Sequence, residues 1–416
     1  MASLLPCTGV AEVRFNPAQA ALDRDRNGAI SAAEAPPMLA RWISAADQDG
    51  SGDLSPAEFH GLLGSLLPPR LPEGQTPAPA PPLNTASGSP AWSDVDAYIS
   101  AMTRDLPLEG ASLVVIRDGQ VVHQRAYGLY DLDSQIPIAS ATKWLNAALI
   151  MTVVDEGKLD LDAPISTYLD WARGPMGSAT LRQLLSHTGG FSPSHLADQP
   201  RSLSLEASAR DAFARPPVGA PGAQFRYGGA GMQVAAFAAE KVTGIPYAQL
   251  FEARITGPLG MTNTHIGFAQ KREDRASVTN PIAAAGGYST AADYARFLEM
   301  LAGGGQFRGR TILSEKAIHE MFRDYSERRA TLGAGTSVGD QRGYGLGAWC
   351  NEIAADGVCS VVQSGGAFGT SPVVQVKERT AILLMVKDRM PQIRAHWAVV
   401  TEAIASILAT SAGPRR

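Results

Sequence analysis

The stretch "PIASATKWL" (residues 137–145) sets a serine three residues before a lysine, at the start of a long apolar run. Residues with this spacing lie on one face of a helix, one turn apart, so the side chains of Ser140 and Lys143 should meet. A lysine is costly to bury, and the apolar residues after Lys143 leave it little solvent-facing surface. A serine becomes a good nucleophile when a base takes its proton, and a desolvated lysine can be that base or tune a second one. We therefore interpret the pair as a nucleophile and its basic neighbour.

The spacing alone is weakly specific, but it belongs to a longer ordered set of motifs. The set consists of "YDLDSQIPIASATKWLNAALI" (130–150), "TLRQLLSHTGGF" (180–191), "PGAQFRYGGAGMQVAAFAAEKVTG" (221–244), "AAAGGYSTAADYARFLEMLAGGG" (283–305) and "VVQSGGAFGTSPVVQV" (361–376). This set resembles the serine beta-lactamase-like superfamily, which includes class C beta-lactamases, D-alanyl-D-alanine peptidases, 6-aminohexanoate-dimer hydrolases and family VIII carboxylesterases. The resemblance covers nearly all of residues 94–410.

The resemblance implies a role for each matching residue. Ser140 would be the acylated nucleophile, Lys143 its basic neighbour, and Tyr227 of "YGG" the tyrosine that shares the general-base and general-acid duty. A phenol gives up its proton more readily beside a cation, which Lys143 could supply. The backbone N–H groups of Ser140 and of Ala367, in the expected "SGGA" strand, would form the oxyanion hole. Ser364-Gly365-Gly366 would be the third sequence element, which lines the substrate site.

Two departures from the family pattern bear on the substrate. Gly229 stands where the Y-x-N motif has an asparagine, and Ser364 stands where beta-lactamases carry the lysine of K-T-G. The first change removes a contact to the amide of beta-lactams, and the second removes a cation that would hold a substrate carboxylate. Both favour a neutral ester or amide as substrate, and we expect a carboxylesterase that acts on neutral, short-chain esters. An amidase or transacylase is the nearest alternative, followed by a beta-lactamase or D-amino-acid peptidase.

Three other residues are weaker candidates for a catalytic role. Ser289 in "GGYSTA" approximates a nucleophile elbow, but Ala291 replaces its last glycine and we expect no clear strand-to-helix turn there. His187 in "SHTGG" is expected to be structural, and Trp144 to belong to the core. The seven histidines show no zinc-binding spacing, so we expect no catalytic metal. A non-enzymatic, calcium-dependent binding protein is the alternative from another class, and the complete Ser-Lys-Tyr set disfavours it.

Two acidic loops near the start of the chain match the calcium-binding EF-hand pattern. They are "DRDRNGAISAAE" (23–34) and "DQDGSGDLSPAE" (47–58), with carboxylate, amide or hydroxyl oxygens at positions 1, 3 and 5, glycine at 6 and glutamate at 12. The expected ligands are Asp23, Asp25, Asn27, the carbonyl of Ala29 and Glu34 in the first loop, and Asp47, Asp49, Ser51, the carbonyl of Asp53 and Glu58 in the second. Ile30 and Leu54 should pair as a short ladder between the loops. We expect two structural calcium sites.

The composition divides the chain into three parts. Residues 1–66 would form the small all-α EF-hand module, the Pro/Ala-rich residues 67–92 a semi-extended linker, and residues 93–416 the hydrolase domain. Within the last part we expect a helix at 94–105, a hairpin over 112–128 with its turn at Asp118-Gly119, and a terminal helix at 396–410.

Charge and cysteine content limit partners and compartment. The net charge of −4 gives no reason to expect nucleic acid as a partner, and no apolar run approaches the roughly 20 residues of a membrane span. The first ten residues lack an intact signal peptide, and we expect a periplasmic or secreted protein whose leader was removed. Of the three cysteines, Cys350 and Cys359 bracket a predicted turn between strands. They could form a disulfide, which would indicate an oxidising compartment, or two small buried side chains.

Overall fold

The computed structural model describes residues 23–34, 43–59, 81–83, 89–193, 203–327, 342–387 and 390–411. The chain divides into two compact units, Met1–Thr76 and Pro77–Arg416. Most of the predicted linker, 67–92, lies outside the described residues.

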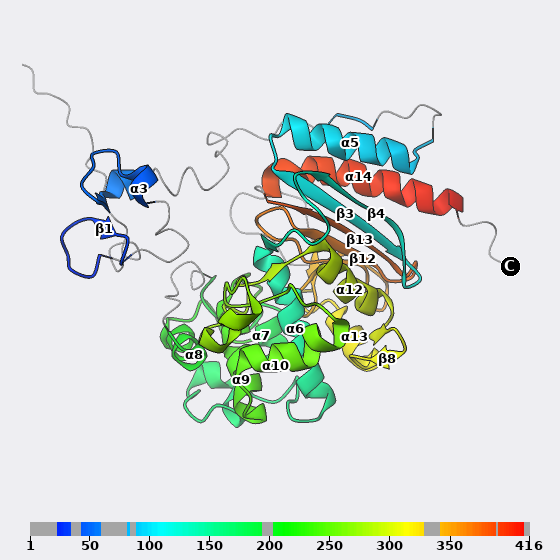
Figure 1. The fold of residues 1–416 in the computed structure, drawn as a ribbon. Helices are drawn as coiled ribbons and strands as arrows, with labels where there is room; N and C mark the ends of the chain where they lie inside the picture. Colours follow the sequence, from blue (N-terminus) through cyan, green and yellow to red (C-terminus); the bar gives the residue numbers. More distant parts are fainter. Residues whose placement is uncertain are drawn as a thin grey trace, which may run out of the picture. The chain divides into compact units, whose positions relative to one another are not determined.

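The larger unit is built on an antiparallel sheet of seven strands (Figure 1). In spatial order the strands are β4 (Gln120–Gly128), β3 (Gly110–Arg117), β13 (Thr380–Val386), β12 (Ser371–Gln375), β11 (Cys359–Gln363), β10 (Trp349–Ile353) and β9 (Gly343–Tyr344). The predicted hairpin is confirmed as β3 and β4, and its turn residues Asp118 and Gly119 both have positive φ, as a tight hairpin turn requires. The first and last strands of the unit meet in the middle of the sheet, where Leu113 pairs with Leu384.

Alternating residues of the central strands serve two cores. On β13, Ile382 and Leu384 pack against α5 (Trp92–Asp105) and α14 (Met390–Ser411). These two helices lie side by side over one face of the sheet (Figure 1). The intervening residue Leu383 faces the opposite core. Since both faces are covered, the strand is apolar throughout, as its burial shows.

A helical region covers the second face of the sheet. Its helices are α6 (Thr142–Asp155), α7 (Leu181–Leu185), α8 (Leu205–Ala214), α9 (Ala230–Thr243), α10 (Tyr247–Phe251), α11 (Gly257–Leu259), α12 (Ala291–Ala302) and α13 (Glu315–Met321). In α6 every side chain from Thr142 to Val153 is buried, which is typical of a helix at the centre of a core. Trp144 packs in this core against Phe297 and Phe322, as predicted. The predicted α+β architecture is thus observed in the larger unit.

Cys350 and Cys359 form a disulfide between β10 and β11. Of the two alternatives left open above, a disulfide or two separate buried side chains, the structure has the disulfide. Among the described residues, no helix combines the length and the apolar character needed to cross a membrane.

The smaller unit contains the two acidic loops. A two-residue strand β1 (Ile30–Ser31) in the first loop pairs with β2 (Asp53–Leu54) in the second, and Ile30 stands opposite Leu54. The predicted ladder is therefore confirmed. A short helix, α3 (Ile43–Ala46), leads into the second loop.

Candidate functional site

Ser140 is held in a tight turn at the start of α6. The preceding strand β5 (Ile136–Pro137) pairs with β6 (Tyr288–Ser289), and the N–H of Ile138 donates to the carbonyl of Gly287. Ala139 then adopts φ of +45°, a left-handed conformation that costs a non-glycine residue about 1–2 kcal/mol. Ser140 follows in a 3-10 turn, Ala139–Ala141, that leads directly into the helix. The prediction that Ser140 begins the helix is correct to within this turn.

The predicted contact between Ser140 and Lys143 is present. Nζ of Lys143 lies 3.0 Å from Oγ of Ser140 and donates a second hydrogen bond, also of 3.0 Å, to the carbonyl of Ala284. Lys143 is only 1% exposed, whereas Ser140 is partly exposed. In such a position water hardly competes for the amine, so the lysine can exchange a proton with the serine hydroxyl directly.

Tyr227 lies over the lysine, with the centre of its ring 4.6 Å from Nζ of Lys143. Trp349 stacks on Tyr227 at 5.2 Å between ring centres, and His187 contacts the tyrosine at 4.7 Å. His187 also forms a 3.1 Å hydrogen bond with the hydroxyl of Tyr344. The sequence did not identify Tyr344 and Trp349 as site residues. Both lie in "GYGLGAWC" (343–350), where no motif marks either residue.

The electrostatics of this aromatic cluster support a structural role for His187. Burial, and next the charge of Lys143, hold the pKa of His187 well below its usual range. Burial raises the pKa of Tyr344 well above its usual range. His187 is therefore neutral and Tyr344 protonated at neutral pH, and both act on Tyr227 through packing.

The "SGGA" segment lies beside the Ser140 turn, but it is not a strand. Strand β11 ends at Gln363, and residues 364–370 form the loop between β11 and β12. The predicted strand, which included the "SGGA" segment, is therefore too long. Oγ of Ser364 lies 3.0 Å from the carbonyl oxygen of Gly347 and 3.4 Å from that of Ser140, and its single proton is shared between these two acceptors. At Gly366 a Cβ atom would lie 2.2 Å from the carbonyl oxygen of Ile138, so only glycine permits this approach.

Ala367, whose N–H was predicted to join that of Ser140 in an oxyanion hole, lies in this loop. Among the described residues, the N–H of Ala367 donates no backbone hydrogen bond, whereas that of Gly366 is bonded to Thr370. Gly365 and Ala367 are at least partly exposed.

Ser289 differs from its prediction in one respect. The two-residue strand β6 leads through the N-cap Thr290 directly into α12, so the strand-to-helix turn that we did not expect is present. Ser289 is nevertheless fully buried, and its hydroxyl is hydrogen-bonded to Thr264 at 2.8 Å. Its accessibility does not suit a nucleophile.

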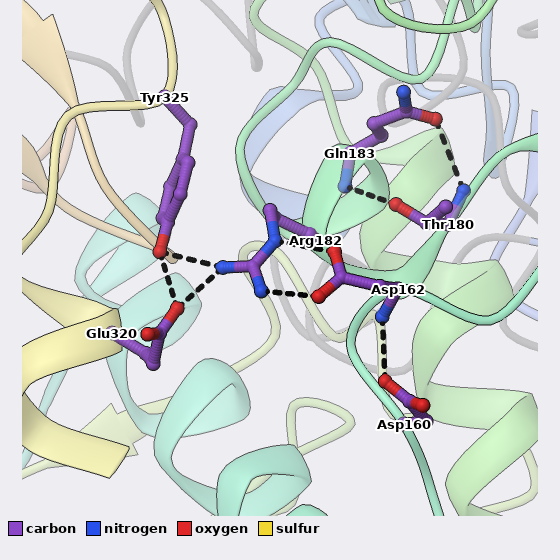
Figure 2. Close-up of polar contacts among 7 residues, drawn as sticks. All are labelled: Asp160, Asp162, Thr180, Arg182, Gln183, Glu320 and Tyr325. Atoms are coloured by element: carbon purple, nitrogen blue, oxygen red, sulfur yellow. Dashed lines mark hydrogen bonds and ion pairs between the residues drawn. The ribbon is translucent and has the colours of Figure 1, made fainter. Parts of the chain in front are cut away.

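A partly buried ion cluster ties α7, which leads to His187, to α13 (Figure 2). Arg182 donates two hydrogen bonds of 2.7 Å to Asp162, and its third nitrogen contacts Glu320 and the hydroxyl of Tyr325. Hydrogen bonding to Asp162, more than offsetting the cost of burial, raises the pKa of Arg182. The backbone N–H of Tyr325 in turn donates to the carbonyl of Tyr344. The ion cluster thus supports the aromatic cluster around Tyr227 at two places, through the helix that leads to His187 and through the backbone of Tyr344.

The two acidic loops bring their carboxylates together. Oxygens of Asp23, Asp25 and Glu34 lie within 4.8 Å of one another, as do those of Asp47, Asp49 and Glu58. Backbone N–H groups of Gly28 and Gly52 donate to Asp23 and Asp47. Both glycines have φ near +90° (87° and 90°), which the turn at position 6 requires.

Hydrogen bonds within the loops keep the two position-12 glutamates, Glu34 and Glu58, ionised. Hydrogen bonds from the backbone and side chain of Ser31 lower the pKa of Glu34 to about 2, and those from Ser55 lower the pKa of Glu58 to about 2. A set of ionised carboxylates with a nearby amide, hydroxyl and backbone carbonyl suits a hard cation.

Comparison with known proteins identifies the larger unit. A model of the Beta-lactamase family matches residues 95–403. The chain belongs to the beta-lactamase family. It is a serine hydrolase, in keeping with the Ser140–Lys143 pair.

Curated proteins with different names resemble the chain, and two of the names state an enzyme activity. The Mycobacterium tuberculosis protein Rv1367c (strain H37Rv) is 31% identical, over 58% of this chain and 74% of its own length. Esterase EstB of Burkholderia gladioli is 29% identical over 44% of this chain and 53% of its own length. The D-alanyl-D-alanine-carboxypeptidase/endopeptidase AmpH of Escherichia coli K12 is 32% identical over 41% and 48%. The chain spans about half the length of the last two relatives.

Solved structures support the same family fold. A Bacteroides dorei protein described as a candidate beta-lactamase has a TM-score of 0.65 and 28% identity, and covers 75% of this chain and all of its own (100%). EstCE1, a hydrolase with promiscuous acyltransferase activity, has a TM-score of 0.63 at 20% identity, with coverage of 75% and 98%. At this identity the second likeness concerns the fold alone.

Proposed function

We propose that the chain is a carboxylesterase that cleaves neutral, short-chain esters through an acyl-enzyme on Ser140. The observation that carries the proposal is the 3.0 Å contact between a buried Lys143 amine and the Ser140 hydroxyl. Oγ of Ser140 attacks the ester carbonyl carbon while its proton passes to Lys143. The N–H groups of Ser140 and Ala367 bind the oxyanion. Tyr227 then gives its hydroxyl proton to the leaving alkoxide. In deacylation Tyr227 takes a proton from the attacking water, and protonated Lys143 returns its proton to Ser140 as the carboxylic acid leaves, which regenerates the enzyme.

Two features favour esters over lactams and peptides. Gly229 offers no amide side chain, and the Ser364 hydroxyl is bonded to two backbone carbonyls. Neither position therefore supplies the contacts to a lactam amide or a substrate carboxylate. The similarity to an esterase, EstB, supports this choice. The similarity to the peptidase AmpH supports amide hydrolysis as the second candidate, on the same Ser-Lys-Tyr centre.

A hydrolysis screen separates these activities. Wild type and Ser140→Ala would be assayed with p-nitrophenyl acetate and butyrate, a chromogenic cephalosporin and D-alanyl dipeptides. We expect rapid ester cleavage that disappears in the variant, with much slower lactam opening. Cephalosporin or dipeptide turnover comparable to ester turnover would instead support the amide-cleaving alternatives.

We also propose that the loops are an EF-hand pair that binds two calcium ions. Asp23, Asp25, Asn27, Glu34 and the carbonyl of Ala29 would hold one ion, and the second loop would use Asp47, Asp49, Ser51, Glu58 and the carbonyl of Asp53. The paired strands, the glycine turns and the ionised glutamates support the proposal. As in extracellular modules, an affinity of roughly 10⁻⁴ to 10⁻³ M would suffice.

Calcium is proposed to stabilise the module without entering catalysis, since no ligand is near Ser140 in sequence. Titration calorimetry should show two sites, each weakened sharply by Glu34→Gln or Glu58→Gln in the full chain. Calcium should raise the melting temperature by mass action. Ester hydrolysis at 25 °C should persist in excess chelator. A rapid, reversible loss of most activity would instead show that calcium shapes the catalytic site.

We further propose a periplasmic or secreted location. The disulfide between Cys350 and Cys359 supports it, because such bonds persist in oxidising compartments. Fractionation of the native cells followed by thiol alkylation would test it. A cytoplasmic protein with both thiols reduced would contradict it.

A further inference from the structure

The carbonyl that holds Lys143 comes from a segment with unusual backbone geometry. Ala284 accepts a hydrogen bond of 3.0 Å from Nζ of Lys143. Two residues earlier, Ile282 has φ of +47°, which is a marked outlier for a β-branched residue and persists only when its surroundings enforce it. The surroundings of this segment therefore determine where the Ala284 carbonyl lies.

Gln233, from the first turn of α9, makes the contacts that enforce this conformation. Its Oε1 accepts a 2.6 Å hydrogen bond from the N–H of Ala283, directly before Ala284. Its Nε2 donates to Oδ1 of Asn280 at 2.8 Å and to Oγ of Ser208 at 2.9 Å. Oδ1 of Asn280 also accepts from the N–H of Ile282 at 3.2 Å. Gln233 is fully buried, so these bonds do not compete with water.

Gln233 also lies close to Tyr227 along the chain. Its backbone N–H makes a bond of the first helical turn of α9, to the carbonyl of Gly229 at 3.1 Å, two residues after Tyr227. One side chain thus joins the start of α9, which follows Tyr227, to the segment that contacts Lys143.

We propose that Gln233 is a positioning residue that holds the Ala284 carbonyl against Lys143 and so aims the lysine at Ser140. The inference rests on the proposed acyl-enzyme function. To accept the proton of Ser140, the amine of Lys143 must be neutral, with two N–H bonds and one lone pair. When one N–H is fixed on Ala284, the lone pair has fewer orientations and can point at the Ser140 hydroxyl. Loss of this anchor should slow proton transfer, while the binding of substrate changes little.

Three substitutions test the role of the Oε1–Ala283 contact. Gln233→Met keeps the length but removes the acceptor. Gln233→Asn keeps the amide but is one methylene too short to reach Ala283. Gln233→Glu keeps an acceptor at the right length but replaces the Nε2 donor to Asn280 and Ser208 with an oxygen. We expect the first two to lower kcat on p-nitrophenyl butyrate at least about tenfold with KM within about threefold, and the third to have a kcat between theirs and that of wild type.

A matched control separates positioning from general destabilisation. Tyr127→Phe removes a buried 2.6 Å hydrogen bond to Asp96, between β4 and α5. It should lower the melting temperature without changing kcat by more than about twofold. If only one of the Met and Asn variants folds, that variant carries the test. A folded Met or Asn variant with wild-type kcat, alongside an inactive Ser140→Ala, would overturn the role of Gln233 alone. Full activity in Ser140→Ala would overturn the proposed function itself.

Discussion

The ring of Tyr227, and not its hydroxyl, makes the recorded contact with Lys143. Nζ of the lysine lies 4.6 Å from the ring centre, and within the described part of the chain no hydrogen bond joins the Tyr227 hydroxyl to Ser140 or Lys143. A cation–π contact of this kind can stabilise a charged lysine. The hydroxyl is then left for the substrate, so ring and hydroxyl have separable functions.

Tyr227→Phe tests this separation, because it keeps the ring and removes only the hydroxyl. We expect kcat on short-chain esters to fall at least about 10²-fold, as for loss of a general acid–base group. The melting temperature should stay close to that of wild type, since the stacking on Trp349 is retained. Near-wild-type turnover in a folded Tyr227→Phe protein would mean that the tyrosine acts only through its ring.

Arg182→Lys should destabilise the protein although the charge is conserved. Arg182 bonds Asp162 with two nitrogens while a third reaches Glu320 and Tyr325 (Figure 2). A lysine has no planar fork and cannot reproduce this arrangement. We expect a loss of about 2 kcal/mol in the free energy of unfolding, measured in urea. The surface variant Arg379→Lys, in an exposed pair with Asp118, is the control and should change it by less than about 0.5 kcal/mol. Equal effects of both variants would contradict a structural role for the cluster.

His187 should make folding stability sensitive to acid. Its pKa is held well below the usual range by burial and next by the charge of Lys143, so the folded protein keeps it neutral. The unfolded chain binds a proton below about pH 6.5. The contribution of neutral His187 to the free energy of unfolding is therefore fully present above about pH 6.5, and it is lost as the pH falls below that value.

His187→Gln removes this titration. The stability difference between wild type and variant should shrink below pH 6.5, by up to about 1.4 kcal/mol for each pH unit. Urea denaturation of both proteins between pH 7.5 and 5 measures it. A difference that stays constant with pH would show that His187 is protonated in the folded state.

Local patterns predicted much of the fold and the candidate site. The turn at Asp118-Gly119, the pairing of Ile30 with Leu54 and the contact of Ser140 with Lys143 follow from short-range spacing. Tertiary contacts decided the rest. Strand β6 exists because it pairs with β5, more than a hundred residues earlier in the sequence.

The backbone groups of the site are the least predictable from sequence. Ala284 contributes a carbonyl, which every residue carries, and only the strained segment around Ile282 brings it to Lys143. Strand β11 ends before the two glycines because the chain must turn close to Ile138 at Gly366. Such effects leave no pattern in residue type alone.

The central claim is that Lys143 activates Ser140 for covalent chemistry. Its most direct test is labelling of the full chain with a p-nitrophenyl phosphonate, with the modified residue located by peptide mass spectrometry. We expect one adduct, on Ser140, absent in Ser140→Ala and formed at least about 10²-fold more slowly in Lys143→Ala. An adduct on Ser289, or labelling of Ser140 at an unchanged rate without Lys143, would contradict it.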